Sequence, residues 1–307
     1  MNKSPKISGI RTTVKSHITF DESRLETFGI NNFDPFTTTE EFIPLSNQGS
    51  LKTGPPLRTD FYILVLCLKG ESQKNIGPFT IDVKPLTIHL VSPKYISSYR
   101  DKTDDLELYM LLFKLEFLTR SFIKEEVILQ LLEISPDMTP IYDLSEDAFY
   151  QLKALFEQID REYRERKAYN RQIVRLLLIQ SLFEMSRACE KCKISAAKQA
   201  SRQSKIVMDF KKHVDRYFLE KRSVQEYAQI LHISPKYLLE VVKKETGQTA
   251  LNIIHSRIYL EAQFLLSQSQ KSIKEIALGL GFDTSSHFSR FFRQFEGKTP
   301  LQYQQQL

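Results

Sequence analysis

A helix-like segment near the C-terminus, "SSHFSRFFRQFEG" at residues 285–297, has two faces of different chemistry. Aromatic residues recur at helical spacing and predict a buried face, namely Phe288, Phe291, Phe292 and Phe295. The opposite face carries short polar and guanidinium groups, namely Ser285, Ser286, Ser289, Arg290 and Arg293. An aromatic stripe alone would indicate only a core. Hydroxyl and guanidinium groups, however, suit the base edges and phosphates of DNA, so this second face is a candidate nucleic-acid contact.

The segment belongs to a unit that occurs twice in the chain. Residues 224–254 read "VQEYAQILHISPKYLLEVVKKETGQTALNII" and residues 273–303 read "IKEIALGLGFDTSSHFSRFFRQFEGKTPLQY". Each copy predicts a helix, a tight turn and a second helix, with Ser223 and Ser272 as N-caps. The second helix is expected to end at Gly247, as a left-handed cap, in the first copy and near Gly297 in the second. Two copies are too few for a solenoid, so we interpret each as a helix-turn-helix whose second helix fits a major groove.

A helix of about 249 to 267 is predicted between the two copies. At 1.5 Å per residue it would be a rod of roughly 27 Å. Successive major grooves on one face of DNA are about 34 Å apart. The duplication therefore predicts that one protomer presents two recognition helices to adjacent grooves.

Charge is unevenly distributed along the 307 residues, whose formal net charge is +6. The first 160 residues have an acidic excess, whereas the segments 161–204 and 205–307 are both basic. A basic second half suggests a polyanionic partner, although a solvated basic face is the alternative.

No catalytic, cofactor or metal constellation emerges from the sequence. The six histidines are scattered, and only His89 lies in the β-rich segment, which disfavours a metal-binding barrel. Cys189 and Cys192 form a CxxC without a second ligand pair at zinc spacing, so two thiols on a helix end in a reducing cytosol are expected. No signal peptide or membrane span is predicted, because the apolar run 173–185 is short and contains charges.

The N-terminal half changes from β to helical character near Leu118. Strands are predicted at 61–70 and 106–118, in a segment punctuated by Gly and Pro that favours a sandwich or barrel. Ser145 is expected to cap a helix, and a second helix at about 170–190 is apolar on most faces. Dimerisation through helices 145–190 and packing of these helices onto the barrel both stay open. Residues 191–204 lack large apolar side chains except Ile194 and are predicted to be the interdomain linker.

The second copy resembles the signature of the AraC/XylS family of bacterial transcription regulators. The likeness rests on I-x-E-I-A, G-F, the aromatic-S-R-F-F run and G-x-[ST]-P-x-x-Y, and "SPKYLLEVVKKETG" with "SRIYLEAQFLL" resembles the first half of the same domain. The resemblance covers about 205–307. A looser resemblance links the β-rich segment to the family's cupin-like effector domain.

The resemblance implies DNA contacts from both recognition helices, namely Lys236, Leu239, Glu240, Lys243, Ser285, Ser286, His287, Ser289, Arg290 and Arg293. Leu239 and Glu240 depart from the usual pattern, in which polar or basic residues are common. A glutamate accepts from cytosine N4 but repels phosphates, so whether the first helix reads bases stays open. Three alternatives remain: Arg290 pairs with Asp283 or Glu296, His287 packs, and Lys243 is merely solvated.

We therefore predict an α+β protein with a cupin-like barrel at about 35–118 and accessory helices at about 119–190, which together form an effector or dimerisation domain over 1–190. A linker at 191–204 and a double helix-turn-helix domain at 205–307 follow. The expected function is sequence-specific transcription regulation in the cytoplasm, with duplex DNA as partner and with a small-molecule effector, a homodimer and contact with RNA polymerase left open. No cofactor is expected. The effector-binding residues are unknown, Arg58 being a guess, and Arg257 is expected to be structural. The alternative is a small-molecule cupin enzyme with a helical partner-binding appendage.

Overall fold

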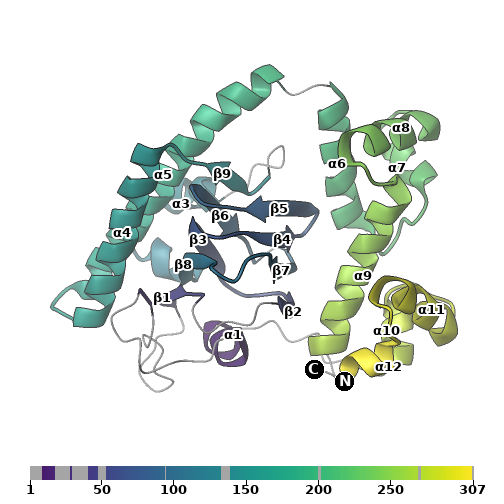
Figure 1. The fold of residues 1–307 in the computed structure, drawn as a ribbon, viewed down its shortest axis with the longest axis horizontal. Coiled ribbons are helices and arrows are strands. Elements are labelled where there is room, and N and C mark those ends of the chain that lie inside the picture. The colour runs from purple at the N-terminus through teal and green to yellow at the C-terminus, as the bar shows by residue number, and fades with distance from the viewer. Residues whose placement is uncertain are drawn as a thin grey trace.

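The computed structural model describes residues 9–17, 28–29, 41–47, 53–93, 95–132, 139–199, 202–268 and 271–305. Figure 1 shows two β-sheets at the centre, with the long helices α4 (Glu146–Glu165) and α5 (Asn170–Gln199) along one side of them. The helices from α6 (Arg202–Tyr217) onward lie on the other side. The predicted order of a β-rich part followed by an all-helical part is confirmed.

Nine described strands form two antiparallel sheets. The five-stranded sheet has the order β1-β8-β3-β6-β9, and the four-stranded sheet has the order β2-β7-β4-β5. Their bounds are β1 Phe42–Ser46, β2 Thr53–Leu57, β3 Tyr62–Lys69, β4 Ser72–Ile76, β5 Phe79–Val83, β6 Thr87–Val91, β7 Ser97–Asp101, β8 Glu107–Phe113 and β9 Ile141–Asp143.

The described strands form two separate sheets and no closed barrel, so of the two predicted alternatives, sandwich or barrel, the structure has the sandwich. Strand β2 lies at the edge of its sheet and reads "TGPPL", and its pairing with β7 shifts register between Gly54 and Leu57. Proline has no N–H to donate to a further strand and is therefore confined to sheet edges. The predicted strand 106–118 is also too long, because β8 ends at Phe113 and helix α2 (Leu115–Thr119) follows.

The five-stranded sheet is buried on both faces. Leu64 and Leu66 of β3 pack with the helices of the N-terminal part, whereas Val65 and Cys67 pack toward the four-stranded sheet. This arrangement explains why β3 reads as a continuous apolar run rather than an alternating one. The helices α1 (Ile10–His17) and α3 (Glu125–Leu132) complete the N-terminal part.

Helix α4 begins where the sequence predicts, since the Ser145 side chain accepts a hydrogen bond from the amide of Ala148. Helix α5 is longer than predicted and reaches Gln199, and α6 begins at Arg202. Helical structure thus covers most of the segment 191–204, whose Ala, Lys and Gln residues are good helix formers. None of the described helices is both long and apolar enough to cross a membrane.

In the described residues of the C-terminal part, α6 is followed by six further helices: α7 Val224–Ile230, α8 Pro235–Thr246, α9 Ala250–Gln268, α10 Ile273–Gly279, α11 Ser285–Glu296 and α12 Pro300–Gln304. Their apolar faces share one core, in which Tyr227, Phe264, Phe288 and Phe292 are fully buried. Helix α9 runs between the two helix-turn-helix units, as the sequence predicts.

Candidate nucleic-acid interface and inter-sheet cavity

The first helix-turn-helix, α7 and α8, is fixed by local hydrogen bonds. Ser223 and Glu226 form a reciprocal capping box at the start of α7. The chain then turns through His232, whose φ of +53° is left-handed, and the amide of Ile233 returns to the carbonyl of Ala228 at 3.0 Å. Ser234 caps α8, and Pro235 occupies its first turn. These bonds set the direction in which α8 leaves the turn.

Helix α8 buries one face and exposes the other. Leu238, Val241 and Val242 are in the core. The predicted contact residues lie on the exposed face, namely Lys236, Leu239, Glu240 and Lys243. The Lys243 ammonium donates to the carbonyl of Gly247 at 2.8 Å, within the C-cap of the same helix. Leu239 is 42% exposed, which places an aliphatic group where it can meet a thymine methyl.

The second unit, α10 and α11, repeats this construction with a more polar outer face. Ser272 and Glu275 form the capping box of α10, and Thr284 caps α11. Phe288, Phe291 and Phe292 are buried, as predicted. Of the predicted contact residues, Ser286, His287, Arg290 and Arg293 are exposed, whereas Ser285 and Ser289 are half-buried.

Arg290 and His287 of α11 each had a predicted alternative to DNA contact. Within the described residues Arg290 forms no ion pair with Asp283 or Glu296. Glu296 instead bonds the Tyr259 hydroxyl and accepts from the Gln263 amide at 3.1 Å. His287 lies with its ring edge-on to Phe282, at 5.3 Å between ring centroids, while its residue remains exposed. Arg290 is thus available for a ligand, and His287 combines a packing contact with exposure.

Helix α9 is tied to helix α6 by Arg257, in agreement with the structural role expected for this residue. The Arg257 guanidinium donates to Asp215 of α6 at 2.8 Å and to Glu261 of α9 at 3.0 Å. It also lies 3.9 Å from the centroid of the Phe218 ring. Because Arg257 is 8% exposed, these contacts satisfy a charge that is almost entirely removed from water.

A contact between the two units was missed by the sequence reasoning. Arg222 precedes α7 in the first unit, and its guanidinium lies 4.8 Å from the centroid of the Phe282 ring in the turn of the second. A Cβ on Gly281, whose φ is +72°, would lie 2.9 Å from the Arg222 guanidinium. The left-handed backbone therefore favours glycine at this turn, and an added Cβ would also displace the end of the Arg222 side chain.

The helical part also contacts the sheets, through β2, β7 and α9. The Arg58 guanidinium, directly after β2, forms an ion pair with Glu261 at 3.3 Å and lies 5.0 Å from the Phe264 ring centroid. Ile96, directly before β7, is buried in the core of the C-terminal helices. Glu261 is thus shared by Arg257 and Arg58.

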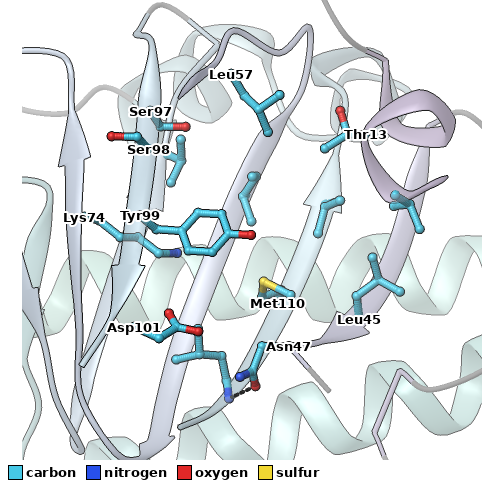
Figure 2. Close-up of a pocket in the computed structure, with 15 residues that line it drawn as sticks. Thr13, Leu45, Asn47, Leu57, Lys74, Ser97, Ser98, Tyr99, Asp101 and Met110 are labelled. Carbon is cyan, nitrogen blue, oxygen red and sulfur yellow. Dashed lines mark hydrogen bonds between the residues drawn. The ribbon is translucent and has the colours of Figure 1, made fainter. Parts of the chain in front are cut away.

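A cavity lies between the two sheets, beside these same strands (Figure 2). The empty space between its lining residues is about 840 Å³, a volume that includes space open to solvent, and most of its wall is aliphatic. Leu57 of β2 and Ser97 of β7 line it, while Arg58 does not, so the guess that Arg58 faces an effector is not supported. Polar groups enter from Lys74, Tyr99 and Asp101, which Figure 2 shows grouped at one side of the space.

Burial changes the ionisation of the polar groups in this region. Desolvation lowers the pKa of Lys74 to about 8, against the opposing effect of Asp101. Burial raises the pKa of Tyr99 to about 12, with Asp101 acting in the same direction. His89 is fully buried, and neither of its ring nitrogens has a hydrogen-bond partner in the described structure. Desolvation and Lys74 both lower its pKa, so its imidazole is neutral.

Comparison with known proteins gives matches along the chain. A helix-turn-helix domain family matches residues 227–306. The chain is 25% identical over 288 residues to the Msm operon regulatory protein of Streptococcus mutans, covering 91% of this chain and 96% of that relative. It is 32% identical over 109 residues to the uncharacterized HTH-type transcriptional regulator YtdP of Bacillus subtilis, covering 35% of this chain but only 14% of that relative.

One solved structure that is similar to the C-terminal part is a transcriptional regulator from Chromobacterium violaceum, described as having an AraC-type DNA-binding domain. It is 25% identical, covers 33% of this chain and 90% of that chain, and has a TM-score of 0.31.

Proposed function

We propose that this chain, which is an AraC-type DNA-binding transcription regulator, reads two adjacent major grooves of duplex DNA through α8 and α11. The observation that supports this most directly is the duplication itself. Two capped helix-turn-helix units, each with an exposed outer face on its second helix, flank one 19-residue helix, α9. Figure 1 shows α8 and α11 on the side of α9 away from the sheets, where a duplex would have access to both.

The two recognition helices would contribute differently. Helix α11 offers Ser286, Arg290 and Arg293, whose hydroxyl and guanidinium groups pair with base edges and phosphates. Helix α8 offers Lys236 and Lys243 for phosphates, together with Leu239 and Glu240. We infer that α11 supplies most of the base readout and that α8 mainly adds phosphate contacts. Ser285, His287 and Ser289 lie at the margin of the α11 face and complete the proposed set.

The proposal is tested by selecting binding sites from random duplex DNA with the full chain and then measuring affinity by mobility shift. Arg290→Ala should weaken binding to the selected site by about 1–3 kcal/mol and relax the preference at one base pair, because a bidentate arginine–guanine contact is worth that much. Arg187→Ala is a suitable control, since Arg187 is exposed on α5 in the N-terminal part. Unchanged affinity and preference in Arg290→Ala would remove Arg290 from the proposed interface.

Salt dependence separates this function from a protein-binding role of the helical part. A DNA complex should weaken steeply between about 50 and 200 mM salt, because bound lysines and arginines release counterions from the phosphates. Binding through an apolar protein interface would change little over the same range.

We further propose that a small-molecule effector in the inter-sheet cavity controls DNA binding and that the N-terminal part forms a dimer. Exposed aromatic and aliphatic residues on the two long helices, and in the turn between them, support the dimer, namely Tyr150, Tyr169, Leu176 and Phe183. The inner faces of α4 and α5 pack on the five-stranded sheet, so only their outer faces would meet a partner copy. Sedimentation of the full chain tests the dimer. Binding at a promoter would bring the protein, in the bacterial cytoplasm, beside RNA polymerase.

A further inference from the structure

The inter-sheet cavity contains a cation for which the described structure provides no counter-ion in contact. Lys74 of β4 is 9% exposed, and its ammonium group makes neither a hydrogen bond nor an ion pair with any residue that the structure describes. Asp101 and Cys67 act on it electrostatically, and Asp101 is the carboxylate near enough to favour its charged form. Figure 2 shows the ammonium group directed into the cavity beside the ring of Tyr99.

A buried ammonium group without partners is unfavourable for folding. Removing a charge from water costs several kcal/mol unless paired groups compensate for it. A methionine of similar length would fill the same place without that cost. The position therefore makes physical sense if an anion occupies the cavity in the functional state.

The remaining wall indicates what kind of anion this is. Val14, Leu57, Val91 and Met110 are among the aliphatic side chains that line the space, so the body of the ligand is apolar. The Tyr99 hydroxyl, protonated at neutral pH, is a second donor on the same side as Lys74. Asp101 opposes a second negative charge at this end of the cavity.

We propose that the inter-sheet cavity binds a small monocarboxylic acid with an apolar body, whose carboxylate lies against Lys74 and whose body packs on the aliphatic walls. The inference rests on the proposed function, in which this cavity holds the effector. A carboxylate supplies the acceptor that Lys74 lacks, and a single charge avoids the repulsion that a dianion would meet at Asp101.

Isothermal titration of the full chain with matched acids and amides tests the inference. The probes are octanoate and 3-phenylpropanoate, with octanamide and 3-phenylpropanamide as uncharged counterparts of the same shape. At least one acid should bind about tenfold more tightly than its amide, because a charge-assisted hydrogen bond to the ammonium is lost in the amide. Lys74→Met should abolish that preference, while Lys69→Met, which removes an exposed lysine of β3, should keep it.

Three results would overturn the inference: no binding of either acid at millimolar concentration, equal affinity for acids and amides, or a preference for acids that survives in Lys74→Met. The Lys74→Met protein is expected to fold, since the substitution removes a buried charge. The DNA mobility shift is independent of this titration. A protein that binds DNA but none of the acids would contradict this inference and leave the proposed DNA readout standing.

Discussion

The burial of the Lys74 ammonium group predicts an effect on stability that does not depend on any ligand. Its folded-state pKa of about 8 lies below the ordinary value of 10.5. At pH 7 the lysine is charged in both states, and its burial destabilises the folded one. Lys74→Met should therefore raise the free energy of unfolding at pH 7 by about 2 kcal/mol.

The sign of the pH dependence follows from the same shift. Between about pH 8 and 10.5 the unfolded chain binds more protons at this site, so the wild type gains stability as the pH rises. The advantage of Lys74→Met should shrink over that range. Urea unfolding of both proteins at pH 7 and pH 10 measures the difference, and an equal difference at the two pH values would contradict the assignment.

At the level of single elements, Arg222 makes a direct contact between the two helix-turn-helix units. Its guanidinium lies on Phe282 of the second unit, and α9 is the other connection between them. Such a stacked cation is worth about 0.5–2 kcal/mol. Arg222→Met should leave both units folded but loosen their mutual orientation. We then expect a smaller loss of DNA affinity than in the wild type when the spacing between the two contacted DNA segments is lengthened or shortened by one base pair.

The control for Arg222→Met is Arg216→Met, because Arg216 stacks on Tyr217 within the same helix, at 5.3 Å from its ring centroid. That variant should keep the spacing preference of the wild type. If Arg222→Met also keeps it in mobility shifts, the two units are oriented by α9 alone.

The sequence predicts the elements of the helical part well because their determinants are local. Ser223, Ser272 and Gly247 act within one or two turns of the helix they begin or end, and the structure confirms each of them. Whether the strands close into a barrel could not be predicted in this way, since strand pairing joins segments that are distant in the sequence. The prolines of β2 indicate the end of a sheet only once β2 is known to be an edge strand. The contact face of α11 was predictable as a polar stripe, whereas Arg222 was not, because its partner Phe282 is 60 residues away in the sequence.

At the scale of the whole molecule, the ion pair between Arg58 and Glu261 joins parts of the chain that are 203 residues apart. Strand β2 contributes Leu57 to the cavity, and the next residue, Arg58, contacts α9. A ligand that moves the end of β2 would therefore act on α9, the helix between the two helix-turn-helix units. The wall of the proposed effector cavity is thus connected, through Arg58 and Glu261, to the helix that joins the two proposed DNA-contacting units.

Arg58→Ala should weaken the contact between the two parts. Glu261 keeps its bond to Arg257, so the cost is limited to the partly exposed ion pair and the stacking on Phe264, about 1 kcal/mol. We expect faster proteolytic cleavage within 191–204 in this variant. Lys102→Ala removes an exposed ion pair with Asp82 that lies within the N-terminal part, so this variant should be cleaved at the wild-type rate. Equal rates for all three proteins would show that Arg58 does not hold the parts together.

Hydroxyl-radical footprinting of the full chain on its selected DNA site tests most directly whether one protomer reads two grooves. Readout of two adjacent grooves predicts two protected segments per protomer on the same face of the duplex, about one helical turn apart. It also predicts that Arg290→Ala weakens protection more in one of the two segments than in the other. A single protected segment per protomer, or two segments on opposite faces of the duplex, would contradict the proposed readout of two grooves by one protomer.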